Sequence, residues 1–341
     1  MTSRERVIRS LNHQSVDRMP RDLWLAPGME AEEHADDLAE LNSRCPSDIL
    51  HVDMRSPAGK RTKGNANRAG HYTDAWGCAW QLGPRGTAAT LLESPLADPS
   101  GLAIYEAPEE LLEPARFSKT MRGCENTTRF VLAWSDIRPL DRLLALRGTE
   151  AGIADMAAGS KELRGLLGKI HDFYRREIEV WATTSVDGVV LGDLLGAAAG
   201  LRIPFRVFRQ WIRPLYREYC EILRQNDKFA FFCSEGPLPE VFGELIEAGV
   251  DAIHAPLALD GLEKMADKYR NRITFWGGID QKHVEPPCAL QDIRDAVLKV
   301  RRALDYGTGG VIAQCQWGQT TPIRNIAAFF EEWLIPLPVN V

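Results

Sequence analysis

Two cysteines far apart in the sequence stand where short apolar runs end. Cys233 closes the run 229–233, and Cys315 directly follows the run 310–314. A carboxylate, Glu235, comes two residues after the first thiol. Thiolates are ligands that zinc and other soft metals prefer, and a carboxylate can complete the set. These residue types predict a zinc site, provided that the fold brings the two runs together.

Other reactive or polar side chains stand at the ends of further apolar runs. His254 could supply a ring nitrogen to a metal as a fourth ligand, or a hydrogen bond to a substrate. Asp193 could position a substrate or relay a proton, or it could organise its loop by accepting backbone N–H bonds. Glu235 is also a candidate general acid or base. The candidates for contact with a substrate are His51, Asp53, Trp76, Gln316 and Trp317. The two tryptophans could equally serve in packing.

The elements that must position these residues alternate along the chain as short apolar runs and longer helical patterns. This alternation is typical of a parallel α/β sheet. The predicted strands are Met19–Leu25, Asp48–Asp53, Phe130–Trp134, Val186–Leu191, Phe229–Cys233, Ala252–His254, Ile273–Trp276 and Gly310–Gln314. Eight parallel strands can close a (β/α)8 barrel, whose active sites lie at the carboxyl ends of the strands. We therefore predict one TIM barrel domain over residues 1–341.

One segment, residues 54–128, is too long for a single crossover between two strands. Its runs 71–81 and 87–92 flank a turn at Gly83-Pro84, which indicates a β-ribbon. We predict a ribbon inserted after the second strand, with the insertion covering the barrel mouth. Elsewhere, Pro214 lies inside an apolar helical stripe and predicts a kink, and Thr321-Pro322 predicts the start of the last helix.

Composition excludes several classes of protein. A chain of 341 residues with 45% hydrophobic and 26% charged residues is typical of a globular protein. Its net charge of −6 gives no reason to expect a nucleic-acid partner. The sequence contains no run of about 18 apolar residues, so we expect no membrane span. Seven cysteines without a compact repeat fit reduced thiols, and the N-terminus has no signal-peptide core. We expect a cytoplasmic protein, and a homodimer is compatible with these features.

Several motifs, in this order and spacing, resemble the uroporphyrinogen decarboxylase superfamily. They are Thr2-Ser3-Arg4-Glu5-Arg6-Val7, Asp17-Arg18-Met19-Pro20, Asp74-Ala75-Trp76-Gly77, Gly192-Asp193-Leu194-Leu195-Gly196, Leu245-Ile246-Glu247-Ala248-Gly249-Val250-Asp251, Gly277-Gly278-Ile279-Asp280, and Thr321-Pro322 with Asn325. The resemblance runs nearly end to end and is closer to the corrinoid-linked zinc methyltransferase branch, which is methylcobalamin:coenzyme M methyltransferase-like. It implies a (β/α)8 barrel with its site at the carboxyl ends of the strands.

True uroporphyrinogen decarboxylases use no metal and hold a polycarboxylate with an arginine pair after the first strand. The corresponding stretch here, residues 25–33, has no arginine and carries Glu30, Glu32 and Glu33. Acids would repel a polycarboxylate substrate, so uroporphyrinogen itself is not the expected substrate.

The methyltransferase branch holds zinc with a His-x-Cys pattern and a later cysteine. By resemblance, Cys233 occupies the histidine position, Glu235 the first cysteine position and Cys315 the last, and both replacements can still bind zinc. The resemblance implies a zinc-dependent methyltransferase or demethylase that moves a methyl group between a small substrate and a corrinoid (cobalamin). The sequence has no corrinoid-binding motif of the Asp-x-His-x-x-Gly kind, so the corrinoid would come on a partner protein or diffuse in.

Two alternatives remain open. The first is a metal-independent decarboxylase or lyase of the same superfamily that acts on a smaller carboxylic acid, with Asp193 and Glu235 as acid and base. The second is a catalytically silent barrel that binds a corrinoid or tetrapyrrole. Metal content separates the zinc-dependent methyltransferase from the metal-independent decarboxylase or lyase, and visible absorbance tests for the silent barrel that binds a corrinoid or tetrapyrrole.

Overall fold

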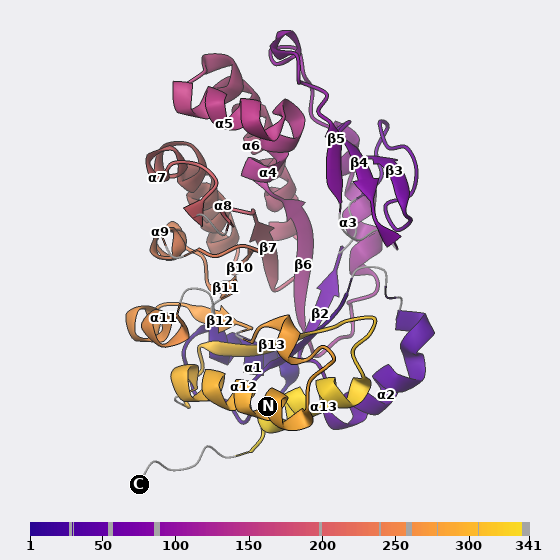
Figure 1. Ribbon diagram of the computed structural model, residues 1–341, viewed down its shortest axis with the longest axis vertical. Helices are drawn as coiled ribbons and strands as arrows, with labels where there is room; N and C mark the ends of the chain where they lie inside the picture. The colour runs from indigo at the N-terminus through magenta and orange to yellow at the C-terminus, as the bar shows by residue number, and fades with distance from the viewer. Residues whose placement is uncertain are drawn as a thin grey trace. The chain divides into compact units, whose positions relative to one another are not determined.

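The computed structural model describes residues 1–26, 29, 31–53, 57–84, 89–197, 200–238, 240–256, 261–277, 279–305 and 307–335. Eight parallel strands form one sheet and alternate with helices along the chain, so the fold is a (β/α)8 barrel, as predicted (Figure 1). The strands are β1 (Arg21–Leu25), β2 (Ile49–Val52), β6 (Phe130–Ile137), β7 (Gly188–Gly192), β10 (Phe229–Cys233), β11 (Ala252–His254), β12 (Thr274–Trp276) and β13 (Val311–Trp317). Each overlaps one predicted strand.

The chain divides into two compact units. Unit 1 comprises residues 1–50, 127–131 and 251–341, and unit 2 comprises residues 51–126 and 132–250. Strands β2 and β6 contribute residues to both units.

In unit 1 the strand order is β1-β13-β12-β11, with all pairs parallel. Leu23 of β1 pairs with Cys315 of β13, and Phe275 of β12 pairs with Val311. The helices of unit 1 are α1 (Ser3–Leu11), α2 (Ala35–Arg44), α11 (Leu262–Tyr269), α12 (Leu290–Leu304) and α13 (Ile323–Glu332). Helices α12 and α13 pack side by side (Figure 1). The predicted last helix is confirmed, but it begins one residue later than expected, with Pro322 as its N-cap.

Buried ion pairs fix the start of unit 1. The Asp48 carboxylate accepts hydrogen bonds from the Arg6 guanidinium at 2.7 Å, from Arg18 at 2.6 Å and from the Arg21 backbone N–H at 2.8 Å. Because Arg6 also pairs with Asp17, the Asp17-Arg18 motif belongs to one charge network that ties α1 to β1. A buried charge must be paired to be tolerated, so this motif acts through structure.

In unit 2, β7 lies between β10 and β6, and Cys233 of β10 pairs with Gly192 of β7. The helices are α3 (Pro114–Met121), α4 (Pro139–Arg147), α5 (Thr149–Ala158), α6 (Lys161–Ala182), α7 (Phe205–Val207), α8 (Arg213–Gln225) and α9 (Phe242–Ala248). A π-helical segment, Phe208–Ile212, directly precedes α8, and Pro214 lies in the first turn of α8, so the kink predicted at Pro214 stays a prediction. Within the described ranges, no helix combines the length and the apolar character needed to cross a membrane.

The inserted β-ribbon is confirmed, with one strand more than predicted. Strands β3 (Gly70–Thr73), β4 (Ala79–Leu82) and β5 (Thr90–Glu93) form an antiparallel sheet. The run 71–81 is two strands because the Asp74 carboxylate accepts the backbone N–H groups of Trp76 at 3.0 Å and Cys78 at 2.9 Å, which makes a turn. Residues 87 and 88 of the second predicted run lie outside the described residues. The prediction that the insertion covers the barrel mouth stays a prediction.

Candidate functional site

The predicted site residues fall into two groups, one in each unit. Unit 2 holds His51, Asp53, Trp76, Asp193, Cys233 and Glu235. Unit 1 holds His254, Cys315, Gln316 and Trp317.

Cys233 is the last residue of β10, as predicted, and its thiol has charged neighbours of both signs. Burial raises the pKa of the Cys233 thiol to about 12, an increase that the Arg138 guanidinium opposes and the Glu235 carboxylate reinforces. The thiol is therefore protonated at neutral pH unless a cation joins it. A metal cation or a closer arginine would supply that stabilisation.

Arg138 is the cation of this cluster, and it is not among the site residues predicted from the sequence. Its Nε lies 3.4 Å from Asp136 Oδ1, and one terminal nitrogen lies 3.9 Å from Asp141 Oδ2. These two carboxylates, together with Cys233 and Glu235, hold the pKa of Arg138 above its ordinary value although burial opposes this. The predicted strand 130–134 ends three residues before β6 does, and this error hid Arg138 as a strand-end residue.

Asp193 follows β7 directly, and its carboxylate is engaged by the start of α4. It accepts the backbone N–H groups of Leu140 at 3.0 Å and Asp141 at 2.8 Å, and the hydroxyl of Tyr216. Burial and the Asp141 charge raise the pKa of Asp193 well above its ordinary value, despite these three donors. This geometry is that of a helix N-cap supplied from another element, the loop-organising role that the sequence left open. The predicted role in catalysis remains a prediction.

The Asp141 side chain makes the reciprocal contact, with the residue that follows Asp193. Its carboxylate accepts the backbone N–H of Leu194 at 2.9 Å and the Arg202 guanidinium at 2.7 Å. Gly192 allows β7 and the Cys233 backbone to approach closely, since a Cβ at this position would lie 2.9 Å from the Cys233 carbonyl oxygen. The Gly-Asp-Leu motif thus holds the end of β7 against the start of α4 and beside Cys233.

The other predicted residues of unit 2 are tied to neighbours. Asp53 pairs with Arg116 of α3, and burial raises the pKa of its carboxyl. The His51 ring lies 5.6 Å from the Trp134 ring. Trp76 is buried against Phe173, and the Arg142 guanidinium lies 4.9 Å above its ring. Packing accounts for the burial of Trp76, and contact of these residues with a substrate is untested.

In unit 1 the strand register separates the two predicted metal ligands. Paired residues of parallel strands point to the same face, and successive residues point to opposite faces. Cys315 pairs with Leu23, whereas Gln316 pairs with Trp24 on the other face. The His254 ring lies 4.7 Å from the Trp24 ring. Cys315 therefore lies on one face of this sheet, and His254 lies on the other with Gln316.

The environments of these two residues differ accordingly. Cys315 is buried inside β13, two residues before its end, and burial raises the pKa of its thiol above the ordinary value. It therefore lies within the strand instead of following it. His254 is the last residue of β11, as predicted, and burial lowers its pKa. Trp317 donates its indole N–H to the Thr321 carbonyl at 2.8 Å.

The donor chemistry suits zinc, although the described side chains do not assemble a complete site. Thiol, carboxylate and imidazole are all zinc ligands, and Cys233 and Glu235 share the cation Arg138 as a neighbour. Arg138 would compete with a metal ion for the Glu235 carboxylate and for a thiolate formed at Cys233. Across the described ranges, no group of three or more His, Cys, Asp or Glu side chains is arranged to hold a metal ion. The predicted ligand set stays a prediction.

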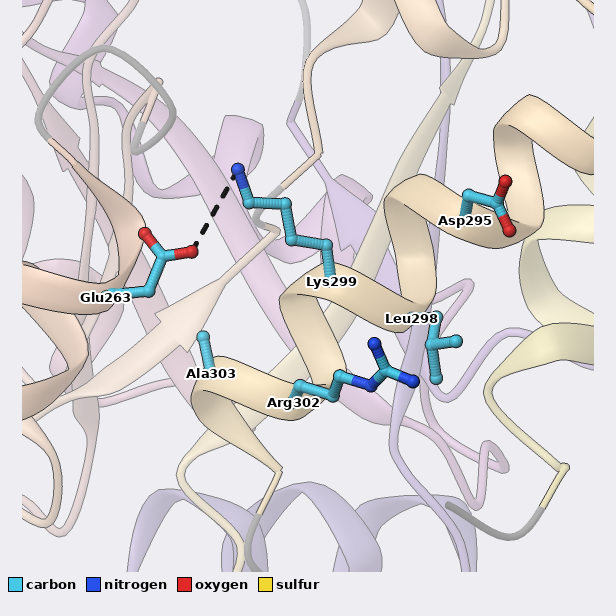
Figure 2. A pocket seen from close by; sticks show the side chains of 6 residues that line it. All are labelled: Glu263, Asp295, Leu298, Lys299, Arg302 and Ala303. Carbon is cyan, nitrogen blue, oxygen red and sulfur yellow. Dashed lines mark ion pairs between the residues drawn. The ribbon is translucent and has the colours of Figure 1, made fainter. Parts of the chain in front are cut away.

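A surface groove of unit 1 offers different chemistry. It lies between α11 and α12, has a volume of about 430 Å³ and is lined by Glu263, Asp295, Leu298, Lys299, Arg302 and Ala303 (Figure 2). Lys299 and Glu263 form an ion pair at 3.9 Å across it. Its lining has neither a thiol nor an imidazole, so this groove is not the thiol-bearing site.

Comparison with known proteins shows the fold and no family. No protein-family model and no curated protein matches the chain. A solved structure, a methyltransferase from Methanosarcina mazei, matches over 98% of both chains with a TM-score of 0.73 and 13% identity. At this identity, the similarity shows a shared barrel fold. A GH113 β-1,4-mannanase (TM-score 0.40, 11% identity, 93% of this chain and 99% of that one) and the pneumococcal virulence factor StrH (0.41, 10%, 96% and 84%) are too distant to support an inference.

Proposed function

We propose that this protein is a methyltransferase that moves a methyl group between a small substrate and a corrinoid. The observation that carries the proposal is the end-to-end similarity to a methyltransferase structure, which covers 98% of each chain. A polar cluster with a thiol at the end of β10 supports it. The finer assignment, to the corrinoid-linked branch of the uroporphyrinogen decarboxylase superfamily, rests on the motifs of the sequence.

We further propose that Cys233 and Glu235 bind zinc. Bound there, zinc would act as a Lewis acid that lowers the pKa of a thiol or polarises a methyl donor. Cys315 and His254 remain candidate ligands, and because they lie on opposite faces of the sheet in unit 1, each needs its own test.

The residues of the chain have distinct tasks in this proposal. Cys233 is partly buried, and the Arg138 guanidinium would stabilise negative charge on Cys233 and Glu235. The mutual contacts of Asp193 and Asp141 fix the start of α4, which directly follows Arg138. Because the Asp193 carboxylate already accepts three hydrogen bonds, it has little capacity left as a base, which gives less support to the alternative decarboxylase or lyase.

The proposed partners are a small-molecule methyl donor or acceptor and a corrinoid, delivered by a partner protein or free. Neither nucleic acid nor a membrane is part of the proposal. We place the protein in the cytoplasm, where thiols stay reduced, since all seven cysteines are free.

Zinc content tests the proposal. We would measure it by inductively coupled plasma mass spectrometry for the wild type, Cys233→Ala, Glu235→Gln, Cys315→Ala and His254→Gln. The matched control is Cys220→Ala, which removes a buried thiol from α8. We expect about one zinc per chain in the wild type and the control and almost none in Cys233→Ala.

Methyl transfer is followed separately by the absorbance change of methylcobalamin with a thiol acceptor. A wild type that neither contains zinc nor takes it up would contradict the metal assignment. Carbon dioxide release from a small carboxylic acid by such a protein would favour the alternative lyase.

A further inference from the structure

The ring of His254 makes one hydrogen bond whose direction is fixed by chemistry. Its Nδ1 lies 2.8 Å from the backbone carbonyl oxygen of Trp276. A carbonyl oxygen can only accept, so Nδ1 must carry the proton. In a neutral imidazole the other nitrogen, Nε2, then carries none and presents a lone pair.

Aromatic rings on the same face of the sheet hold the imidazole in place. The Trp24 ring lies 4.7 Å from the His254 ring, and the Trp276 ring lies 5.8 Å from it. Both tryptophans donate their indole N–H to the same oxygen of Asp22, each at 2.7 Å. Since Asp22 is 0% exposed, one buried carboxylate fixes two ring planes and, through them, the imidazole.

The backbone next to the imidazole is also adapted to it. Gly277 has a φ of +102°, and a Cβ there would lie 2.8 Å from His254 Nδ1. Any side chain at this position would push the ring away from the Trp276 carbonyl. The Gly277-Gly278 motif therefore has a steric role at Gly277, whereas Gly278 lies outside the described residues.

We propose that Asp22, Trp24 and Trp276 are positioning residues that hold His254 with its proton on Nδ1 and present Nε2 as an electron-pair donor. The ligand at Nε2 is a zinc ion or an N–H or O–H group of a substrate, and an anionic group is excluded because it would meet a lone pair. The inference rests on the proposed function only in its choice of zinc as a probe, since the tautomer follows from the geometry of unit 1.

A second histidine, His171, is expected to adopt the opposite tautomer and therefore serves as an internal reference. His171 of α6 has Nε2 3.1 Å from a Glu218 carboxylate oxygen and Nδ1 3.0 Å from the Tyr219 hydroxyl. A carboxylate accepts, and a hydroxyl can donate, so the proton of the neutral ring lies on Nε2. The two rings should therefore give opposite patterns in one spectrum.

The first experiment records long-range ¹H–¹⁵N correlations of the ¹⁵N-histidine-labelled protein, at a pH well above the ordinary histidine pKa. His254→Gln and His171→Gln assign the two rings. We expect His254 as the Nδ1–H tautomer and His171 as the Nε2–H tautomer. A His254 ring that shows the Nε2–H tautomer, or a mixture of both, would overturn the proposal.

The second experiment tests positioning with Trp24→Phe. Its control is Trp80→Phe, which removes an indole N–H bonded to a carboxylate, Asp74, at 3.1 Å in unit 2. Trp24 contacts the His254 ring and is itself held by Asp22, so we expect weaker zinc binding and a mixed His254 tautomer in Trp24→Phe, with neither change in the control. A Trp24→Phe protein with the tautomer of the wild type contradicts positioning.

Zinc binding also separates the failure of this inference from failure of the proposed function. If the wild type takes up no zinc, the proposed metal set fails, and the tautomer of His254 in the wild type and in Trp24→Phe decides the positioning proposal alone. If zinc binds but His254→Gln leaves its affinity unchanged, His254 is no zinc ligand, and the tautomer decides in the same way.

Discussion

Two buried aspartates of this barrel, Asp22 in unit 1 and Asp193 in unit 2, use their carboxylates differently. Both are almost fully buried, and both accept hydrogen bonds from neutral donors. Asp22 binds two indole N–H groups and thereby orients side chains beside His254. Asp193 binds two backbone N–H groups and a phenol, and thereby fixes the start of α4. One aspartate thus positions rings, whereas the other positions a secondary-structure element.

Asp22 is the second residue of β1, whereas Asp193 directly follows β7, and the position after a strand does not by itself assign a role. An aspartate after a barrel strand is typical of an active site. Here the donors that surround the carboxylate decide its role, because a carboxylate engaged by backbone N–H groups acts as a cap. Substitutions that remove each carboxylate therefore measure how far the two roles differ.

The largest effect is expected for Asp193→Ala. It leaves two backbone N–H groups and the Tyr216 hydroxyl without their acceptor in a buried place, so the free energy of unfolding should fall by about 3 to 4 kcal/mol. Urea unfolding followed by circular dichroism measures it. Asp193→Asn keeps one oxygen acceptor and should lose about half as much. If Asp193→Ala keeps its stability but loses activity, Asp193 acts in chemistry and not as a cap.

Asp22→Ala should cost less, because it affects side chains and no helix end. Two buried indole N–H groups lose their acceptor, and we expect a loss of about 2 to 3 kcal/mol in the free energy of unfolding. The near-ultraviolet circular dichroism should also change, since Trp24 and Trp276 lose their fixed planes. An unchanged near-ultraviolet spectrum would show that packing alone orients the rings and would remove the contrast between the two aspartates.

The strands could be predicted from the sequence because each is a short apolar run between longer helical patterns. The face on which a strand residue lies could not. Both faces of a parallel barrel sheet are buried, so the alternation of Gln314 and Gln316 with Cys315 in β13 does not reveal which face points into the barrel. The pairing of Leu23 with Cys315, together with the contact of His254 with Trp24, shows that Cys315 and His254 lie on opposite faces of the sheet.

Two further features were hidden for local reasons. Arg138 escaped notice because Ser135 and Asp136 look like the end of a strand, although β6 continues to Ile137. The turn inside residues 71–81 depends on the side chain of Asp74, which accepts two backbone N–H groups and also pairs with Arg142 at 2.7 Å. Side-chain hydrogen bonds to nearby backbone groups decide such features, and hydrophobic periodicity does not report them.

Tyr216→Phe should make stability more dependent on pH. The folded-state pKa of Asp193 is raised, so the burial of this carboxyl lowers the free energy of unfolding in a pH-dependent way. This destabilisation is absent below the unfolded pKa near 3.8 and grows as the pH rises towards the folded pKa. The Tyr216 hydroxyl opposes this rise, and its loss raises the pKa further. The variant should therefore be less stable than the wild type by about 1 to 2 kcal/mol at neutral pH, with a smaller difference in acid. A difference that does not depend on pH would contradict the coupling.

A smaller effect of opposite sign is expected for Asp17, where pairing and not burial decides the pKa. The hydrogen bond from Arg6 lowers the pKa of Asp17 from 3.8 to about 2, so its contribution is fully present above pH 3.8 and is lost as the pH falls through about 2. The side chain is 43% exposed, and solvent screening reduces the contribution to about 1 kcal/mol or less. Asp17→Asn should therefore lower stability slightly at neutral pH and not at all in strong acid. If its loss instead matches that of Asp193→Ala, the Arg6 network carries more of the fold than an exposed carboxylate can account for.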